Sequence, residues 1–361
     1  MKHRLEHIDG LRGLAAVVVL YQHMAEYWAA LSPGASLATR QLDVLFGYMD
    51  IGKLGVVAFF AISGYIVPFS FDAQRPRLSF VVSRIFRLYP AYWLSLALAV
   101  VLLPLIGHAE FGGRQIAANA TMVQTALRQK DVLDVYWTLL IEVTFYAMCF
   151  GVFSAGLLRK PRAVFWIFCA MLASAVVGAV ARDRGHAGIP AALPLYLAVM
   201  WFGACTRLAT LERDDLARRL CRPMLALLLV AIPFVWFTAY DAGAHKESLL
   251  ADVTAFYAAL AVFLFCVHRR AFASRSWIYL GSISYSLYLL HPIALELATY
   301  WTKHVDWPMR AAVHAFVTLV LSLLGAHLMS RHVERPAVRL GKRMVPALLA
   351  LRRDARNVAA P

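Results

Sequence analysis

An arginine and a histidine stand eleven positions apart in the first apolar stretch of the chain, within residues 8–23. On an α-helix this spacing corresponds to almost three turns and about 16 Å of rise, so Arg12 and His23 share one face. If Arg12 lies at a membrane surface, His23 lies about halfway through the ~30 Å hydrocarbon layer. An ionisable side chain at that depth is a candidate functional group, and the competing interpretation is a histidine hydrogen-bonded inside a helix bundle.

A carboxylate stands in a second apolar run, at Glu142, five positions after Trp137. Trp137 fits an outer aromatic belt, which places Glu142 roughly 8 Å below that surface, while His23 lies roughly 12 Å from the outer end of its own helix. Because these depths are compatible, we predict that Glu142 orients His23 as a general base. Glu26, one turn from His23, is the competing partner, and a contact that only joins helices is the alternative role for Glu142.

Two arginines one turn apart, Arg84 and Arg87, precede Tyr89 and Pro90. Both guanidinium groups can point the same way, and we interpret Pro90 as the start of a helix. A pair of guanidinium groups at a helix start matches the geometry of phosphate oxygens. The alternative is two cytoplasmic cations that contact lipid headgroups.

Other polar and small residues lie in the apolar runs. Ser63 and Gly64 are small enough to allow close helix approach. Pro292 is expected to kink its helix and free a carbonyl, which the preceding His291 would satisfy; we rank this role above catalysis. Six residues are predicted to line a substrate pocket or to support it: Asp9, Ser63, Tyr65, Trp137, Tyr288 and His291.

The elements that position these residues must be membrane helices. The 361 residues are 61% hydrophobic and only 16% charged, with a mean hydropathy of +0.63, which is typical of a multi-pass membrane protein. The Lys and Arg residues behind the net charge of +15 lie between apolar runs and not in a separate basic domain. This distribution indicates contact with anionic lipids and not with nucleic acid. The five single cysteines are not spaced as disulfide or metal ligands, and we predict no metal site.

Hydropathy predicts an all-α integral membrane protein with about ten transmembrane helices. Most of the 36 Lys and Arg residues fall in alternate connecting segments, which predicts that both termini are cytoplasmic. The first span is expected to be uncleaved, residues 1–330 to form the transmembrane domain, and residues 331–361 a basic cytoplasmic tail along the inner leaflet. The predicted spans are residues 11–31, 53–71, 89–107, 137–157, 163–181, 191–208, 223–240, 250–268, 277–298 and 310–330.

Taken in their order along the chain, the motifs described above resemble those of the acyltransferase-3 family. Its members are bacterial membrane O-acyltransferases of surface glycans, antibiotics and Nod factors. The resemblance extends over residues 9–292, and the chain looks like a stand-alone version without the extracellular esterase-like domain of some members. The matching motifs are Asp9-Gly10-Leu11-Arg12-Gly13 with His23, Phe59-Phe60-Ala61-Ile62-Ser63-Gly64, Arg84 and Arg87 with Tyr89-Pro90, Trp137-Thr138-Leu139 with Glu142, and Tyr285-Ser286-Leu287-Tyr288 with His291-Pro292.

The resemblance implies transfer of an acyl group, usually acetyl, from cytosolic acyl-CoA to a sugar hydroxyl at the bacterial inner membrane. Arg12, Arg84 and Arg87 would hold the CoA phosphates. His23 would act as general base with Glu142, or would carry the acyl group as a relay. The expected partners are acetyl-CoA as donor, a glycan or glycolipid acceptor (a cell-surface polysaccharide or lipopolysaccharide) and membrane lipids.

Two other functions stay open at this point. The same fold would serve a succinyl or longer-chain acyltransferase, or one that acts on a small molecule such as a macrolide. A proton-coupled transporter would also use a buried His and Glu, but it predicts an internal repeat, which we do not find in the sequence.

Overall fold

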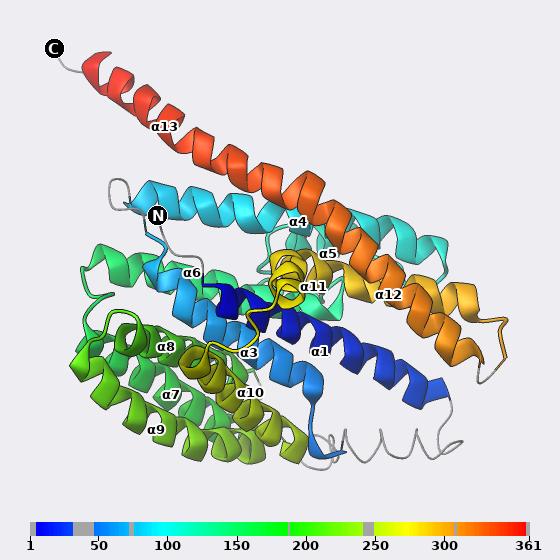
Figure 1. The fold of residues 1–361 in the computed structure, drawn as a ribbon, viewed down its shortest axis with the longest axis horizontal. Coiled ribbons are helices and arrows are strands. Elements are labelled where there is room, and N and C mark those ends of the chain that lie inside the picture. Colours follow the sequence, from blue (N-terminus) through cyan, green and yellow to red (C-terminus); the bar gives the residue numbers. More distant parts are fainter. Residues whose placement is uncertain are drawn as a thin grey trace.

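The computed structural model describes residues 5–31, 47–71, 76–186, 188–240, 249–306 and 309–358. Every regular element in these ranges is helical (Figure 1), which confirms the predicted all-α fold. The long helices are α1 (Glu6–Leu31), α3 (Ile51–Ile66), α4 (Pro76–Leu105), α6 (Trp137–Ser154), α7 (Pro161–Asp183), α8 (Ala192–Thr210), α9 (Asp215–Ala239), α10 (Leu249–Arg269), α11 (Arg275–Thr302), α12 (Met309–Met329) and α13 (Arg335–Val358).

Each of the ten predicted spans coincides with one of the long helices from α1 to α12. In the described part of the chain, nine helices are long and apolar enough to cross a membrane. The first helix, α1, is not among these nine, and it carries Asp9, Arg12 and Glu26 among its apolar residues. It nevertheless packs along α3 and α11 in the middle of the bundle (Figure 1). Asp9 and Arg12 are partly buried there, whereas Glu26 is exposed.

The third span differs from the prediction. Helix α4 begins at Pro76, thirteen residues before the predicted start, and Pro90 lies inside it. A proline within a membrane helix is tolerated when neighbouring groups satisfy the freed backbone carbonyl. Arg84 and Arg87 therefore lie within a continuous helix and not at its first turn, as we had interpreted them.

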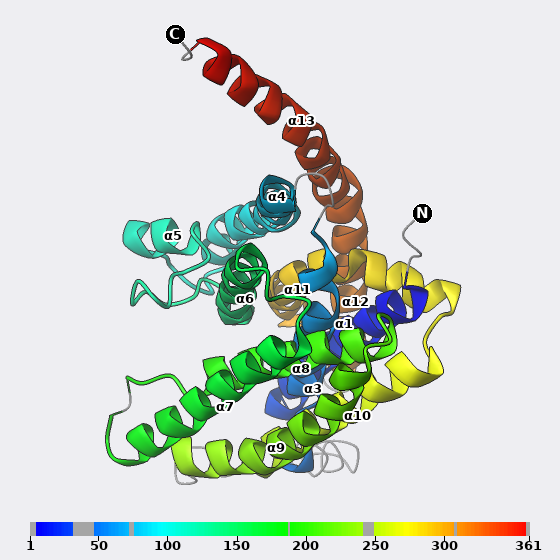
Figure 2. The same cartoon turned by 90° about the vertical axis from the view of Figure 1, so that its left-hand side faces the viewer.

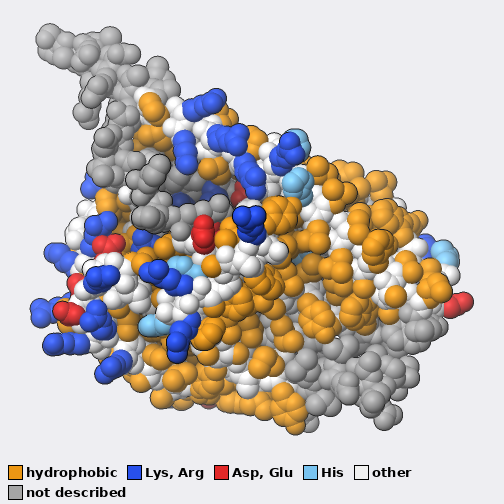
Figure 3. Space-filling model, viewed as in Figure 1, with side chains coloured by type: hydrophobic (Ala, Val, Ile, Leu, Met, Phe, Trp, Pro, Cys, Tyr) orange, Lys and Arg blue, Asp and Glu red, His pale blue; other side chains and the backbone are white. Residues whose placement is uncertain are grey.

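The helices form two groups on either side of α1 and α3. Helices α7, α8, α9 and α10 pack together, and α8 and α10 contact α3, whereas α11 and α12 pack on α1 (Figures 1 and 2). Helix α4 lies beside α11 and α13, with α6 between it and α8. We call the end of the bundle at which α1 begins the inner end; α3, α6, α8, α10 and α12 finish there. Lys and Arg side chains gather at that end in Figure 3, and hydrophobic side chains cover the middle.

Close helix approach depends on glycines at two crossings. A Cβ atom at Gly64 would lie 1.8 Å from the carbonyl oxygen of Met200 on α8. A Cβ atom at Gly281 of α11 would lie 1.7 Å from the carbonyl oxygen of Asp9 on α1. No side chain can occupy either position without separating the helices, so the expected packing role of Gly64 is confirmed.

The connection between α4 and α6 folds back against the bundle. It contains the short helix α5 (Gly113–Asn119), and α4 side chains donate hydrogen bonds to its backbone. Tyr92 Oη lies 2.7 Å from the carbonyl oxygen of Asn119, and Trp93 Nε1 lies 2.9 Å from that of Ala120. This connection therefore reaches the middle of α4, where its polar backbone is covered by protein.

Helix α12 continues into α13 through one π-helical turn, Ser330–Glu334. Glu334 is buried, and α13 packs along α4 (Figure 2). Residues beyond 330 thus contribute to the bundle, and the division into a membrane domain and a tail stays a prediction.

Candidate functional site

A cavity of about 370 Å³ lies between α1, α3, α4, α6, α11 and the first turns of α13. Its charged lining is mostly cationic: Arg12 from α1, Arg84 and Arg87 from α4, and Lys342 from α13, with the carboxylates of Asp9 and Glu142. The structure thus brings together the three arginines that the sequence singled out, although they come from two helices far apart in the chain. Such a set of guanidinium groups can bind phosphate oxygens.

The two arginines of α4 have different surroundings. Arg87 Nη1 lies 3.5 Å from Glu334 Oε1, so a carboxylate balances its charge. The Arg84 guanidinium instead lies 5.3 Å from the ring centroid of Tyr146 and 5.6 Å from that of Phe80. No carboxylate of a described residue pairs with Arg84, which leaves its charge available to an anionic ligand.

Glu334 is a residue that sequence reasoning missed. Its Oε2 accepts a hydrogen bond of 2.9 Å from Ser286 Oγ on α11, and its Oε1 faces Arg87. Glu334 therefore connects the end of α12 to both α11 and α4. The sequence offered one sign of its role: Glu334 is a single acidic residue in the basic segment that directly follows the last predicted span. We had assigned that segment to the cytoplasmic tail.

The predicted contact between Glu142 and His23 is not formed. Glu142 accepts a hydrogen bond from Tyr146 Oη, one turn further along α6, and it lies within electrostatic range of Arg12. The prediction used Trp137 as a residue of an outer aromatic belt. Its ring instead packs against protein, 6.4 Å from that of Phe60 and 5.5 Å from that of Tyr196. Glu142 lines the arginine cavity and not the surroundings of His23.

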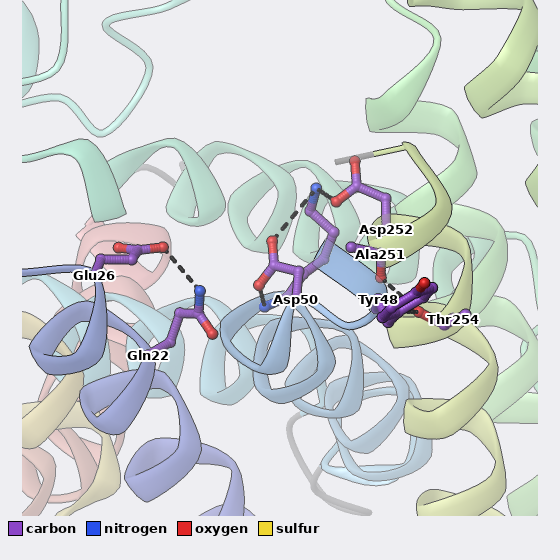
Figure 4. A network of polar contacts seen from close by, with 8 residues as sticks. Gln22, Glu26, Tyr48, Asp50, Ala251, Asp252 and Thr254 are labelled. Carbon is purple, nitrogen blue, oxygen red and sulfur yellow. Dashed lines mark hydrogen bonds and ion pairs between the residues drawn. The ribbon is translucent and has the colours of Figure 1, made fainter. Parts of the chain in front are cut away.

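His23 is paired with Glu26, the partner that the sequence left as the alternative. His23 Nδ1 lies 3.1 Å from Glu26 Oε2, and Gln22 Nε2 donates to Glu26 Oε1 at 2.9 Å (Figure 4). With Nδ1 donating to the carboxylate, Nε2 keeps the lone pair that a general base needs. The His23 side chain is 39% exposed, so an acceptor can reach it.

A second polar network fixes the outer end of α3 next to Gln22. Lys53 forms an ion pair with Asp252 of α10, and its Nζ lies 3.7 Å from Asp50 Oδ2, the cap of α3 (Figure 4). A Cβ atom at Gly52 would lie 3.0 Å from Gln22 Cγ, so α1 and α3 are in close contact here. This network therefore supports the residues that hold Glu26.

Two aromatic side chains of α11 lie between the arginine cavity and His23. Tyr288 lines the cavity, and its ring centroid lies 5.8 Å from that of His291. The His291 ring in turn stacks on that of His23 at 5.3 Å. His291 Nδ1 donates to the backbone carbonyl of Leu287 at 3.2 Å. The carbonyl that Pro292 leaves without its amide donor is that of Tyr288, four positions before the proline, so this bond differs from the expected one.

The remaining candidates divide between two locations. Asp9 and Ser63 line the arginine cavity. Tyr65 lies on another face of α3, where its Oη is 3.1 Å from Thr210 Oγ1, and Trp137 belongs to the aromatic cluster already described. Neither Tyr65 nor Trp137 lines the arginine cavity. Within the described ranges, no three His, Cys, Asp or Glu side chains are grouped to hold a metal ion.

Comparison with known proteins shows the family of the chain. The sequence model of a family described as "Acyltransferase domain" matches residues 5–331. The chain is also 25% identical over 378 residues to nodulation protein 10 of Rhizobium leguminosarum bv. viciae, and the alignment covers 97% of each protein. No solved structure matches the chain. A family match over nearly the whole bundle, from α1 to the π-helical turn, shows that this chain belongs to the acyltransferase-3 family of membrane acyltransferases.

Proposed function

We propose that the protein transfers an acyl group, acetyl in the leading case, from cytosolic acyl-CoA to a hydroxyl of a cell-surface or lipid-linked polysaccharide in the bacterial inner membrane. The observation that carries this proposal is the convergence of Arg12, Arg84 and Arg87 on one cavity between α1 and α4. These cations would bind the CoA phosphates. Neither Arg12 nor Arg84 forms an ion pair with a described carboxylate, whereas Arg87 pairs with Glu334.

The acyl end of the donor would extend toward His23. Helix α1 is continuous from Glu6 to Leu31, so Arg12 and His23 are separated by about 16 Å of helical rise. The pantetheine arm is comparable in length, and it would pass Tyr288 and His291 to reach the imidazole. Glu26, rather than Glu142, would stabilise the imidazolium that forms.

Two reaction courses fit these residues. In direct transfer, the acceptor oxygen attacks the thioester carbonyl carbon, His23 takes the hydroxyl proton, the C–S bond breaks, and the proton passes to the CoA thiolate. In the relay, His23 Nε2 attacks the thioester carbonyl carbon, the C–S bond breaks, and CoA leaves as its thiolate. The acceptor oxygen then attacks the acyl carbon, the C–N bond breaks, and the hydroxyl proton goes to the freed imidazole and from there to the thiolate. The exposed side of His23 is where the acceptor would arrive.

The test is acyl transfer by the purified full chain in lipid nanodiscs, with radiolabelled acetyl-CoA and surface glycan as acceptor. Arg84→Ala should raise the KM for acetyl-CoA about 10- to 100-fold, since it removes charge-assisted hydrogen bonds to phosphate. Arg77→Ala is the matched control, because Arg77 lies on the same helix, is exposed and contacts the backbone of Ser154 instead. Equal effects of the two variants, or no labelled glycan, would contradict the proposal.

The identity of the acyl group and of the acceptor is tested separately. The surface glycan of a strain that lacks this protein should be lighter by one acetyl group per acylated residue, as measured by mass spectrometry. A loss that corresponds to succinyl or a longer chain would replace acetyl as the transferred group. An unchanged glycan would direct the search to a small-molecule acceptor.

A further inference from the structure

A second cavity, of about 840 Å³, lies at the inner end between α1, α3, α8, α9 and α10. Helix α3 separates it from the arginine cavity: Ser63 and Ile66 line the first cavity, and Tyr65 lines the second. The second cavity takes no part in the mechanism proposed above. Its ionisable lining is basic: His7, Arg213, Arg218, Arg222, His268 and Arg270.

The cations of this wall are largely unbalanced. No Asp or Glu of the described chain lines the cavity. Arg218 Nη1 is held by Asp215 Oδ1 at 3.0 Å, but no ion pair joins Arg213, Arg222 or Arg270 to another described residue. These arginines are exposed, so water weakens their mutual repulsion. An anion between them would reduce it further, and their planar donors match phosphate oxygens.

Two of these arginines occupy backbone positions that favour glycine. Arg213 has a φ of 55° and Arg270 a φ of 52°, both in the left-handed region. Arg270 follows the last residue of α10, where glycine is the usual helix-terminating residue. A side chain at such a position costs conformational energy, so glycine can replace either arginine without straining the backbone.

Most of the rest of the wall is apolar and belongs to membrane helices, with the hydroxyl groups of Tyr65, Thr206 and Thr210 among it. Leu225 of α9 and Leu264 and Val267 of α10 line the cavity, and the same two helices expose Leu229 and Phe265 on their surfaces. A ligand that fits both parts has a phosphate for the arginines and a hydrocarbon chain for the leucines. Basic pockets between membrane helices on the cytoplasmic side bind anionic lipid headgroups in this way.

We propose that the second cavity binds the phosphate headgroup of an anionic phospholipid from the inner leaflet, with Arg213, Arg222 and Arg270 as its ligands. The headgroup bridges the end of α8, the first turns of α9 and the end of α10. It lies beside the hydrogen bond between Tyr65 and Thr210, so it also supports the inner end of α3.

The test measures lipid binding to the purified full chain by native mass spectrometry, with phosphatidylglycerol and phosphatidylcholine of identical acyl chains as probes. The wild type should bind phosphatidylglycerol more tightly. In the double variant Arg213→Gly/Arg270→Gly the Kd for phosphatidylglycerol should rise about 30-fold, because two cations near an anionic headgroup are lost. Its melting temperature should stay the same or rise, since glycine adopts the left-handed backbone without strain, so misfolding cannot mimic the result.

Arg128→Gly is the matched control, because Arg128 also has a positive φ, of 55°, but lies in the connection between α5 and α6, away from the cavity. It should leave the Kd unchanged. Arg222→Gln should weaken binding, whereas Arg219→Gln, on the same helix but outside the lining, should not. Equal binding of the two lipids by the wild type, equal losses in Arg128→Gly and the double variant, or displacement of phosphatidylglycerol by coenzyme A would overturn the proposal.

Discussion

The imidazole of His23 stacks on that of His291, with ring centroids 5.3 Å apart and ring planes at 26°. His23 belongs to α1 and His291 to α11, so the stack joins the two helices at the level of the proposed reaction. On its other side, His23 contacts the carboxylate of Glu26. The His23 imidazole is thus held by the His291 ring and by the Glu26 carboxylate, and a substitution can remove either contact without the other.

Glu26 and Glu142 should have different effects on catalysis. Glu26→Gln should lower kcat roughly 10- to 100-fold with little change in the KM for acetyl-CoA, because it removes the charge that stabilises the His23 imidazolium. Glu142→Gln should mainly change the KM, because Glu142 lies beside the donor arginines. Steady-state kinetics of both variants, with His23→Ala as the inactive reference, distinguish these effects. The opposite pattern would restore Glu142 as the partner of His23.

His291 should act by positioning and not by proton transfer. A phenylalanine keeps an aromatic ring against His23, whereas an alanine does not. Because such ring contacts contribute about 0.5–1.5 kcal/mol, His291→Ala should lower kcat by about 2- to 10-fold, and His291→Phe should retain most of the activity. The pH profile of kcat should keep its shape in His291→Phe. Loss of activity in both variants would instead assign a proton-transfer role to His291.

Glu334 and Arg87 should behave as one unit. Glu334→Gln removes the charge that balances Arg87 and should lower the free energy of unfolding by about 1–3 kcal/mol. It should also raise the KM for acetyl-CoA, because Arg87 loses the contact that holds it toward the cavity. The double variant Arg87→Ala/Glu334→Gln should be no worse in KM than Arg87→Ala alone. Additive increases in KM would show that Glu334 acts independently of Arg87.

The sequence was sufficient for the positions of the spans, because long apolar runs alternate with basic connections. It also singled out Arg84 and Arg87 by their one-turn spacing and Arg12 by its spacing from His23, and these three arginines meet in the cavity. The start of α4 was missed because Arg77, Ser79 and Arg84 make its first turns polar. Helix α13 packs along α4, and hydropathy cannot detect this contact.

The arrangement of the carboxylates could not be predicted, because it depends on how deep each helix lies. Trp137 was expected at the membrane interface, yet it packs against Phe60 and Tyr196. It was therefore not a valid reference for the depth of Glu142. Glu334 was assigned to the tail because its neighbours in sequence are basic. Tertiary packing, not local composition, determines both positions.

The π-helical turn Ser330–Glu334 sets the rotational phase of α13 relative to α12. A π turn contains one residue more than an α turn, so deletion of one residue there would rotate α13 by about 100°. Val338 and Lys342 would then leave the wall of the arginine cavity, while the sequence of every predicted span stayed intact. The number of residues in this turn therefore determines which α13 side chains face the arginine cavity. An insertion or deletion within the turn would change the wall of the cavity without replacing any residue that lines it.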